Sequence, residues 1–287
     1  MQSCGPRHQL ETTEHDRVGV ATRVCCAIQF RTNSVQQGLK YISMKLLSSI
    51  CLIAFATPLF ADGPKVSAIV ERARATVGAE AALNNLVTLQ MSGWIEPAES
   101  KMPSATILII SRKPCSQRLV VTVDDLVETT ILEGNSGCII RSNLSDEDKR
   151  AQIRTMTDGE LKRVAFSTRQ FFSFYAADFK GGERIEYQGI EQRRGVRCHK
   201  LLYSYPDGIS TTRYFAINDD TLVSTITDKG VESVEVGEQI VAGIRFPRRV
   251  EYYQGQKMLH TMVVHDIKVN KPLTRGIFTI PTGQKTK

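Results

Sequence analysis

The chain has 287 residues and a net charge of +7, from 37 Lys and Arg against 30 Asp and Glu. Residues 62–287 hold 31 of the basic and 27 of the acidic residues, with no basic stripe interleaved with aromatic side chains, which argues against nucleic-acid binding. Only Cys115, Cys138 and Cys198 follow residue 61, which excludes a disulfide framework and leaves open one disulfide with a free thiol or three buried thiols.

Residues 44–61 have the three-part layout of a secretory signal peptide. Lys45 follows Met44, an apolar run of about a dozen residues comes next, and Pro58 breaks the run before Ala61. The run is shorter than the roughly 20 residues that a membrane span needs. A buried helix of a cytosolic domain is the alternative, but it does not explain the residues at the two ends. We therefore expect export to the periplasm, with cleavage after Ala61.

Residues 1–43 are polar and show no sustained period. Because a signal peptide is N-terminal, the simplest explanation is that translation begins at Met44 and that residues 1–43 come from an upstream start. A disordered leader is the alternative. In both cases the working protein is residues 62–287, a length that suits one β domain.

The domain is expected to open with a helix, followed by strands. Val66, Ile69, Ala73 and Val77 recur at three- and four-residue steps, and Gly78 would end the helix. The period then changes to two, which predicts strands over 87–95, 105–111, 117–123, 126–132 and 138–140. The strand over 105–111 is apolar on both faces.

A helical insertion is expected over 145–175. Ser145 is suited to an N-cap, and Asp148 would complete a capping-box-like start. After Asp158-Gly159 a second helix runs into four aromatic residues between Phe171 and Tyr175. Four aromatic residues in five positions cannot all face inward on one helix, so some should point into a cleft or to solvent.

The remainder predicts a meander, since Gly, Asn and Asp turn signals recur about every ten residues. Strands are expected over 184–191, 194–204, 209–217, 220–228, 230–241, 243–254 and 257–269. The fold class is therefore mainly β (α+β): a curved antiparallel half-barrel of about 11–12 strands, with an N-terminal helix and a helical lid in its concave face.

Such a shell has more apolar inner surface than two helices fill, so the excess would line a cavity for an apolar ligand; the alternative is a fully packed core. The side chains expected to face this cavity are Leu89, Met91, Ile107, Ile109, Leu119, Val121, Phe171, Phe174, Phe215, Val250 and Tyr252. An error of one position on a strand would exchange the whole set for that strand.

The sequence offers no constellation for catalysis, and we expect neither an enzyme nor a cofactor. His260 and His265 are five positions apart in one expected strand, so they point to opposite faces and cannot share a metal ion. Ser136 lacks the Gly-x-Ser-x-Gly frame of a nucleophile elbow. No Gly-rich phosphate-binding loop is present.

The order of these parts resembles that of the LolA-like proteins, the outer-membrane lipoprotein-sorting family, over nearly all of residues 62–287. The resemblance depends on short motifs: Ala73–Ala81 with the pattern Ala-x-x-x-x-Gly-x-x-Ala, Ser92-Gly93, Gly134–Gly137, Gly243–Val250, and the segment Val269–Pro281 with its Phe-x-x-Pro.

The resemblance implies a periplasmic, monomeric protein that carries lipoproteins or other acylated lipids in an apolar cavity toward the outer membrane. Its partners would be acyl chains and transfer components of the inner and outer membranes, with no nucleic acid. The alternative on the same fold is an envelope protein that senses lipids or lipoproteins, or docks a partner, without transport. The family's carriers use an Arg near the cavity mouth, for which Arg112 and Arg118 are both candidates here.

Overall fold

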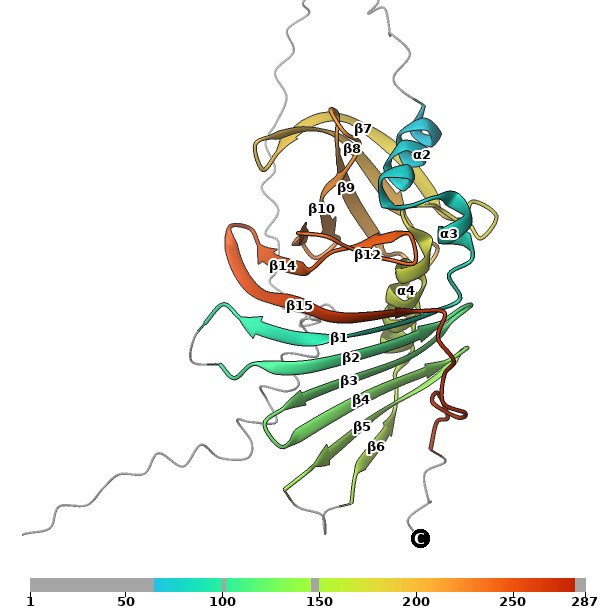
Figure 1. Cartoon of the computed structure of the whole chain (residues 1–287), viewed down its shortest axis with the longest axis vertical. Coiled ribbons are helices and arrows are strands. Elements are labelled where there is room, and N and C mark those ends of the chain that lie inside the picture. The colour runs from blue at the N-terminus through green and yellow to red at the C-terminus, as the bar shows by residue number, and fades with distance from the viewer. Residues whose placement is uncertain (1–64, 100–101, 146–149, 282–287) are drawn as a thin grey trace, which may run out of the picture.

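The computed structural model describes residues 65–99, 102–145 and 150–281, so the expected leader and signal peptide lie outside the described residues. Within these residues, thirteen strands form one antiparallel sheet in the order β6-β5-β4-β3-β2-β1-β15-β14-β11-β10-β9-β8-β7 (Figure 1). The strands are β1 (Thr88–Pro97), β2 (Ala105–Arg112), β3 (Ser116–Val123), β4 (Leu126–Glu133), β5 (Ser136–Asn143), β6 (Gln152–Thr155), β7 (Arg184–Arg193), β8 (Val196–Ser204), β9 (Ser210–Ala216), β10 (Leu222–Thr227), β11 (Val231–Val236), β14 (Arg249–Gln254) and β15 (Lys257–Val269).

The sheet consists of two meanders joined by the last strand. Strands β1–β6 neighbour one another in chain order, as do β7–β11, while β15 pairs with β1 on one side and with β14 on the other. In the described part of the chain, β6 and β7 stand at opposite ends of the order, so the sheet is not closed. The expected curved, mainly antiparallel half-barrel is confirmed.

Three helices accompany the sheet: α2 (Val66–Val77), α3 (Glu80–Asn84) and α4 (Asp158–Ser173). Helix α2 buries Ile69 and Ala73 against β8 and β9, in a cluster with Leu201 and Phe215. Its apolar residues recur at the helical period, and burial of that stripe, more than propensity, stabilises it. The expected N-terminal helix is confirmed, and Gly78 follows it directly.

Helix α4 crosses the concave face of the sheet and forms the expected lid. Near its start, Val164 packs with Leu132 and Ile139 of β4 and β5. Near its end, Phe172 packs with the apolar residues of β1, β2 and β3. Figure 1 shows α4 running across these strands. None of the helices in the described ranges has the length and apolarity of a membrane span.

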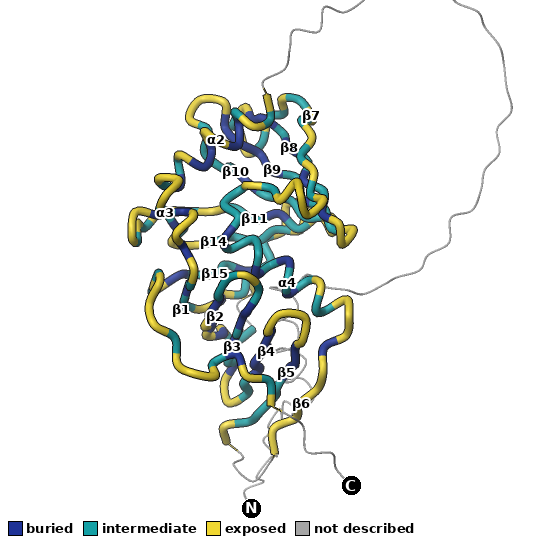
Figure 2. Tube along the Cα trace, turned by 90° about the vertical axis from the view of Figure 1, so that its right-hand side faces the viewer, coloured by how far each residue is buried: buried dark blue, intermediate teal, exposed yellow. Residues whose placement is uncertain are grey.

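The opposite face of β2–β5 is covered by the segment that follows β15. Phe278 is 4% exposed and packs with Ile110, Ile131 and Cys138. Strand β2 is therefore buried on both faces from Ile109 to Ser111, which explains the apolar run there, whereas Thr106 and Leu108 remain exposed. Figure 2 shows the contrast between the buried stretches of these strands and the edge strand β6, which is exposed throughout.

The expected helical start at Ser145 is wrong in part. Residues 146–149 lie outside the described residues, and Gln152–Thr155 form β6, which pairs with β5 from Cys138 to Arg141. The helix begins at Asp158, capped by Thr157, so Asp158-Gly159 is its first turn and does not precede it as a break. The pairing along β5 outweighs the local signal at Ser145.

The expected strands over 230–241 and 243–254 are each divided. The chain leaves the main sheet after β11 and forms a separate hairpin of β12 (Gln239–Val241) and β13 (Ile244–Phe246) before returning as β14. Gly237 has a positive φ of 66°, which turns the chain away, and Pro247 follows β13. Ile244 and Phe246 are buried in the core beside α2, so the hairpin gains more by packing than by extending the sheet.

Candidate functional site

A cavity of about 690 Å³ lies between the end of α4 and the sheet. A row of apolar side chains from four adjacent strands forms its floor: Leu119 pairs with Ile109, Ile109 with Met91, and Met91 with Ile267. Phe171 and Phe174, at the end of the helix, also line the cavity. These side chains, with Leu89, Val250, Met262 and Val264, form the apolar wall.

The other side of the cavity is polar. Strands β9, β10 and β11 contribute hydroxyl and charged side chains, which form the polar wall: Thr211, Arg213, Thr225, Thr227, Ser233 and Glu235. The pairings Arg213 with Thr225 and Thr225 with Ser233 place three of them in one row across the strands. The cavity is therefore amphipathic: β1–β3 and β15 supply most of its apolar lining, and β9–β11 supply this polar row together with Leu222 and Val231.

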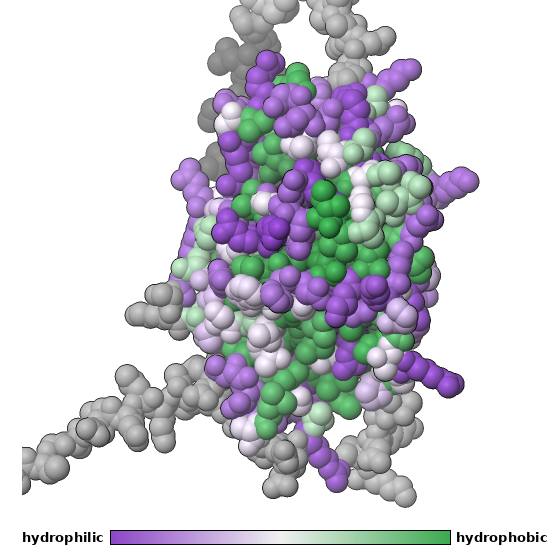
Figure 3. Space-filling model, viewed as in Figure 1, coloured by the Kyte–Doolittle hydropathy of each residue, from purple (hydrophilic) through white to green (hydrophobic). Residues whose placement is uncertain are grey.

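Hydrophobic side chains gather in the middle of the face that Figure 3 shows, between bands of hydrophilic ones, at the level of β12 in Figure 1. The hairpin β12–β13 contributes Phe246 and Arg245 to the cavity lining. In the middle of β12, Ile240 is 70% exposed. The hairpin is thus a second element, besides α4, that borders the cavity.

The end of α4 is held by Arg74 of α2. Its Nη1 donates hydrogen bonds to the carbonyl oxygens of Ser173 and Phe174, at 2.6 and 2.9 Å. Its Nε and Nη2 donate to the carboxylate of Glu80 at 3.1 and 2.8 Å, and this contact lowers the pKa of Glu80. Phe174 and Tyr175 both have positive φ, 41° and 71°, a conformation that bulky residues rarely adopt. Arg74 therefore satisfies helix-end carbonyls where the chain turns sharply beside the cavity.

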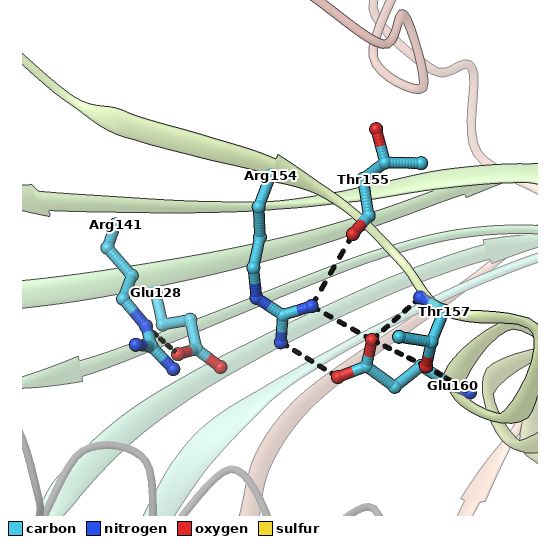
Figure 4. A network of polar contacts seen from close by, with 6 residues as sticks. All are labelled: Glu128, Arg141, Arg154, Thr155, Thr157 and Glu160. Atoms are coloured by element: carbon cyan, nitrogen blue, oxygen red, sulfur yellow. Dashed lines mark hydrogen bonds and ion pairs between the residues drawn. The ribbon is translucent and has the colours of Figure 1, made fainter.

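The start of α4 is held by a capping box. The backbone N–H of Glu160 donates to Thr157 Oγ1, and the Glu160 carboxylate accepts from the backbone N–H of Thr157 at 2.9 Å. Arg154 of β6 adds two ion-paired hydrogen bonds to Glu160, at 2.7 and 2.8 Å (Figure 4). The hydrogen bonds from Arg154 chiefly, with those of Thr157, lower the pKa of Glu160 to about 2. Nearby, Arg141 donates to the buried Glu128 at 2.7 Å.

Arg213 is the charged group that the polar wall buries most deeply, at 7% exposed. Its guanidinium lies 4.3 Å from the ring centre of Tyr203 and 5.4 Å from that of Tyr175, and it donates a short hydrogen bond to Gln170 of α4. Glu235, two strands away, is open to the cavity, but the curved sheet surrounds it on the other sides. Burial within the shell raises the pKa of Glu235, against the opposing effect of Arg245 and Arg213.

The polar row continues through Tyr252 to His260. These two residues pair across β14 and β15, and their rings stack with centres 4.5 Å apart and planes 19° apart. Burial lowers the pKa of His260 to about 4, and its Nε2 has no hydrogen-bond partner among the described residues. His260 is therefore a neutral ring at neutral pH. His265, on the same strand, is exposed.

The structure places eight of the expected cavity residues on the cavity lining: Leu89, Met91, Ile109, Leu119, Phe171, Phe174, Val250 and Tyr252. Ile107, Val121 and Phe215 point to the same side of the sheet but do not line the cavity. Ile107 and Val121 pair with each other one step farther along their strands and are packed in the core. Phe215 is fully buried beneath Tyr175, whose ring stands edge-on at 5.2 Å.

The polar wall was not expected from the sequence. On β9, Thr211 and Arg213 share a face with Phe215. Two polar residues on the same face as a buried aromatic residue are the sequence signal that could have indicated a polar wall. The two arginines considered for the cavity mouth lie elsewhere. Arg112 contacts Glu133 and the ring of Phe278, and Arg118 donates to the carbonyl of Ile277, so both face the C-terminal segment.

Among the described residues there is no group of three or more His, Cys, Asp or Glu placed to hold a metal ion. Cys115, Cys138 and Cys198 are free thiols, whose pKa values burial raises. The arrangement suits the reversible binding of an amphipathic molecule.

The fold is similar to several solved structures. A DUF1329 family protein from Desulfovibrio piger is 8% identical, with a TM-score of 0.48, over 74% of this chain and 96% of that one. A LolA superfamily protein from Nitrosomonas europaea is 10% identical, with a TM-score of 0.49, over 75% and 97%. An outer membrane lipoprotein-sorting protein domain from Vibrio parahaemolyticus is 9% identical, with a TM-score of 0.44, over 73% and 95%.

No family model and no curated protein matches the sequence. The solved structures to which the chain is similar nevertheless include proteins of the superfamily that its motifs resemble. At these identities and TM-scores the likeness carries no information about a ligand or a partner.

Proposed function

We propose that this protein is a periplasmic binding protein that takes the acyl chains of a lipoprotein, or another acylated lipid, into the cavity and carries it toward the outer membrane. The observation that supports this most is the cavity itself, about 690 Å³ between the lid helix α4 and the sheet. Binding sites for small molecules are concave, mostly apolar and of this size. Each methylene group of a chain buried there would contribute about 0.8 kcal/mol.

The lid offers a physical route for entry. Helix α4 packs on the sheet through side chains near both ends, and Phe171 and Phe174 stand between the cavity and the helix. Displacement of this end of the helix would open the apolar wall without unpairing any strand. The expected signal peptide, residues 44–61, is the basis for the periplasmic location.

The proposal is tested by native mass spectrometry, with lipid extraction, on the protein expressed from Met44 in a diderm bacterium and purified, in its exported form, from the periplasm. We expect a co-purifying acylated species near one per chain. A clean mass of the protein alone, together with no uptake of added fatty-acyl or lipoprotein probes, would contradict the proposal and mean that the interior binds no acyl chain.

A matched pair of variants tests the site. Phe174→Asp places a carboxylate on the apolar wall at a positive φ, a conformation that Asp tolerates better than Phe. We expect it to weaken acyl binding by at least about tenfold, since a charge in an apolar site costs well over 1.4 kcal/mol. Phe179→Asp is the control, because Phe179 is 60% exposed and does not line the cavity.

The second candidate function is that of an envelope protein that senses a lipidated signal or docks a partner without transport. Trp94 and Leu108, each 37% exposed, favour it, because they stand beside His265 on the face of the sheet opposite the cavity. If purified protein retained lipid but never released it to acceptor membranes, this function would replace transport.

A further inference from the structure

The polar wall of the cavity buries a positive charge that the protein does not neutralise by direct contact. Arg213 is 7% exposed, yet no described carboxylate forms an ion pair with it. Its partners are the amide oxygen of Gln170 and the faces of Tyr203 and Tyr175. Removing a guanidinium from water costs several kcal/mol unless an anion or good hydrogen bonds compensate. The guanidinium is thus held by a neutral amide and by tyrosine rings, with no described carboxylate in contact.

Hydroxyl side chains share the inner face of the sheet with this charge. Thr211 precedes Arg213 by two positions on β9 and so shares its face; it is 5% exposed, and its Oγ1 has no hydrogen-bond partner among the described residues. Thr225 pairs with Arg213 across β10, and Ser233 pairs with Thr225. A guanidinium beside hydroxyl donors is the combination that binds phosphate and carboxylate oxygens.

The two carboxylates on the cavity lining do not replace such an anion. Glu238 lies 3.7 Å from Arg245 on the hairpin β12–β13, at the border of the cavity. Glu235 is separated from Arg213 by strand β10. The Glu235 side chain is exposed to the cavity and forms no ion pair with Arg213.

We propose that the polar wall binds the anionic head of an amphiphile, a phosphate or a carboxylate, through Arg213 and Thr211, while its acyl chain lies on the apolar wall. This inference depends on the proposed function, since it concerns the ligand of the same cavity. Beyond the proposed function, this inference states that the protein distinguishes acylated molecules by the charge of their head groups. A neutral amphiphile with the same chain would leave Arg213 unpaired and bind more weakly.

The test compares two probes with the same acyl chain, a fatty acid and the corresponding fatty alcohol, titrated into the full chain below their aggregation concentrations. We expect the fatty acid to bind at least about tenfold more tightly, as a charge-assisted hydrogen bond to Arg213 would give. Inorganic phosphate alone at millimolar concentration should not compete, because it lacks the chain. Competition by phosphate would contradict the proposal that the ligand is an amphiphile, and would indicate a site for a free anion.

The variants assign the effect to the site. Arg213→Gln should remove the preference for the fatty acid and leave the affinity for the alcohol unchanged, and Thr211→Val should reduce the preference several-fold. Arg169→Gln is the matched control: it removes the same charge from α4, where Arg169 forms an exposed ion pair with Asp207 and does not line the cavity. If Arg213→Gln does not fold, the probe pair on the wild type and Thr211→Val decide the question.

The outcomes separate the two proposals. Equal binding of both probes to the wild type, or an equal loss of both in Arg213→Gln, would overturn the anionic head site and leave acyl binding intact. Binding of neither probe would overturn the proposed function, and this inference with it.

Discussion

Arg74 and Phe174 are 100 positions apart in the chain, and a 2.9 Å hydrogen bond from the Arg74 guanidinium to the Phe174 carbonyl joins them. The same nitrogen also donates to the carbonyl of Ser173, so one side chain of α2 completes the C-terminal end of α4. Because Phe174 and Tyr175 turn at positive φ immediately afterwards, this contact fixes where the lid ends and the cavity lining begins.

The first prediction concerns this contact. Arg74→Ala leaves the two carbonyls without a donor in a part-buried place, so we expect the free energy of unfolding to fall by about 1–3 kcal/mol. Amide hydrogen exchange should accelerate at the end of α4 more than in the sheet. Arg72→Ala is the control, since Arg72 forms only a half-exposed ion pair with Asp220, which is worth at most about 1 kcal/mol. If both variants lower the free energy of unfolding equally, the hydrogen bonds of Arg74 do not stabilise the end of α4.

The second prediction concerns the start of the lid. The pKa of Glu160 is lowered to about 2 by Arg154 and Thr157. A depressed carboxylate pKa stabilises the fold above the ordinary value near 4.5, and this stability is lost as pH falls toward 2. Glu160→Gln keeps a capping-box residue but loses the ion pair, so it should lower the free energy of unfolding by roughly 1 kcal/mol at neutral pH. As the pH falls, the free energy of unfolding of this variant should decrease less than that of the wild type.

Urea denaturation between pH 2 and pH 7 measures this difference. Glu71→Gln is the control, because Glu71 is exposed on α2 and forms no ion pair with another described residue. If the free energy of unfolding of Glu160→Gln falls with pH as steeply as that of the wild type, carboxylates other than Glu160 cause the pH dependence.

The third prediction concerns His260. Its pKa is lowered to about 4 by burial, so in the folded protein it stays neutral while the unfolded chain takes up a proton near pH 6.5. The free energy of unfolding should therefore fall as pH drops from 6.5 to 4, by on the order of 3 kcal/mol from this residue. His260→Phe keeps the stack on Tyr252, removes a nitrogen without a partner, and should abolish this part of the dependence.

His265→Phe, on the exposed position of the same strand, should retain the wild-type decline. The idea fails if the wild type and His260→Phe lose stability in parallel across that interval.

The fourth prediction concerns the junction of the two meanders. The pairing of β1 with β15 shifts register between Ser92 and Gly93, and a Cβ at Gly93 would collide with the carbonyl oxygen of Val263. Since that atom belongs to the backbone of β15, it cannot move aside without disturbing the central pairing. Gly93→Ala should cost at least about 1–3 kcal/mol in thermal or chemical unfolding, whereas Ser92→Ala should be close to neutral. If Gly93→Ala melts at the wild-type temperature, the pairing of β1 with β15 accommodates a Cβ at this position without loss of stability.

The sequence predicts the fold well where one physical signal dominates. The alternation through residues 257–269 gives β15 within its observed bounds, and the stripe from Ile69 to Val77 gives α2. It fails where tertiary contacts override local signals. Ser145 resembles an N-cap, but the free edge of β5 draws Gln152–Thr155 into a strand.

For the site, the period of two gives the face of each strand but not the depth at which a side chain lies along it. Met91 and Ile109 line the cavity, while Ile107, on the same face of β2, is packed in the core. Arg213 escaped notice because a single charged residue in a strand usually marks the solvent face. Arg213 is buried because β9–β11 curve around the cavity and because Gln170 of α4 accepts its hydrogen bond. Both are tertiary features that the residues around Arg213 in the sequence do not indicate.

The central claim is that an acyl chain occupies the cavity between α4 and the sheet. Photo-crosslinking tests it most directly, with a fatty acid that carries a diazirine near the middle of its chain and peptide mass spectrometry to locate the adducts. We predict adducts on the apolar wall, at Leu119, Phe171, Phe174 and Val250, which an excess of unlabelled fatty acid suppresses. Adducts confined to the opposite face around Trp94 and Leu108, or none that unlabelled fatty acid suppresses, would contradict the claim.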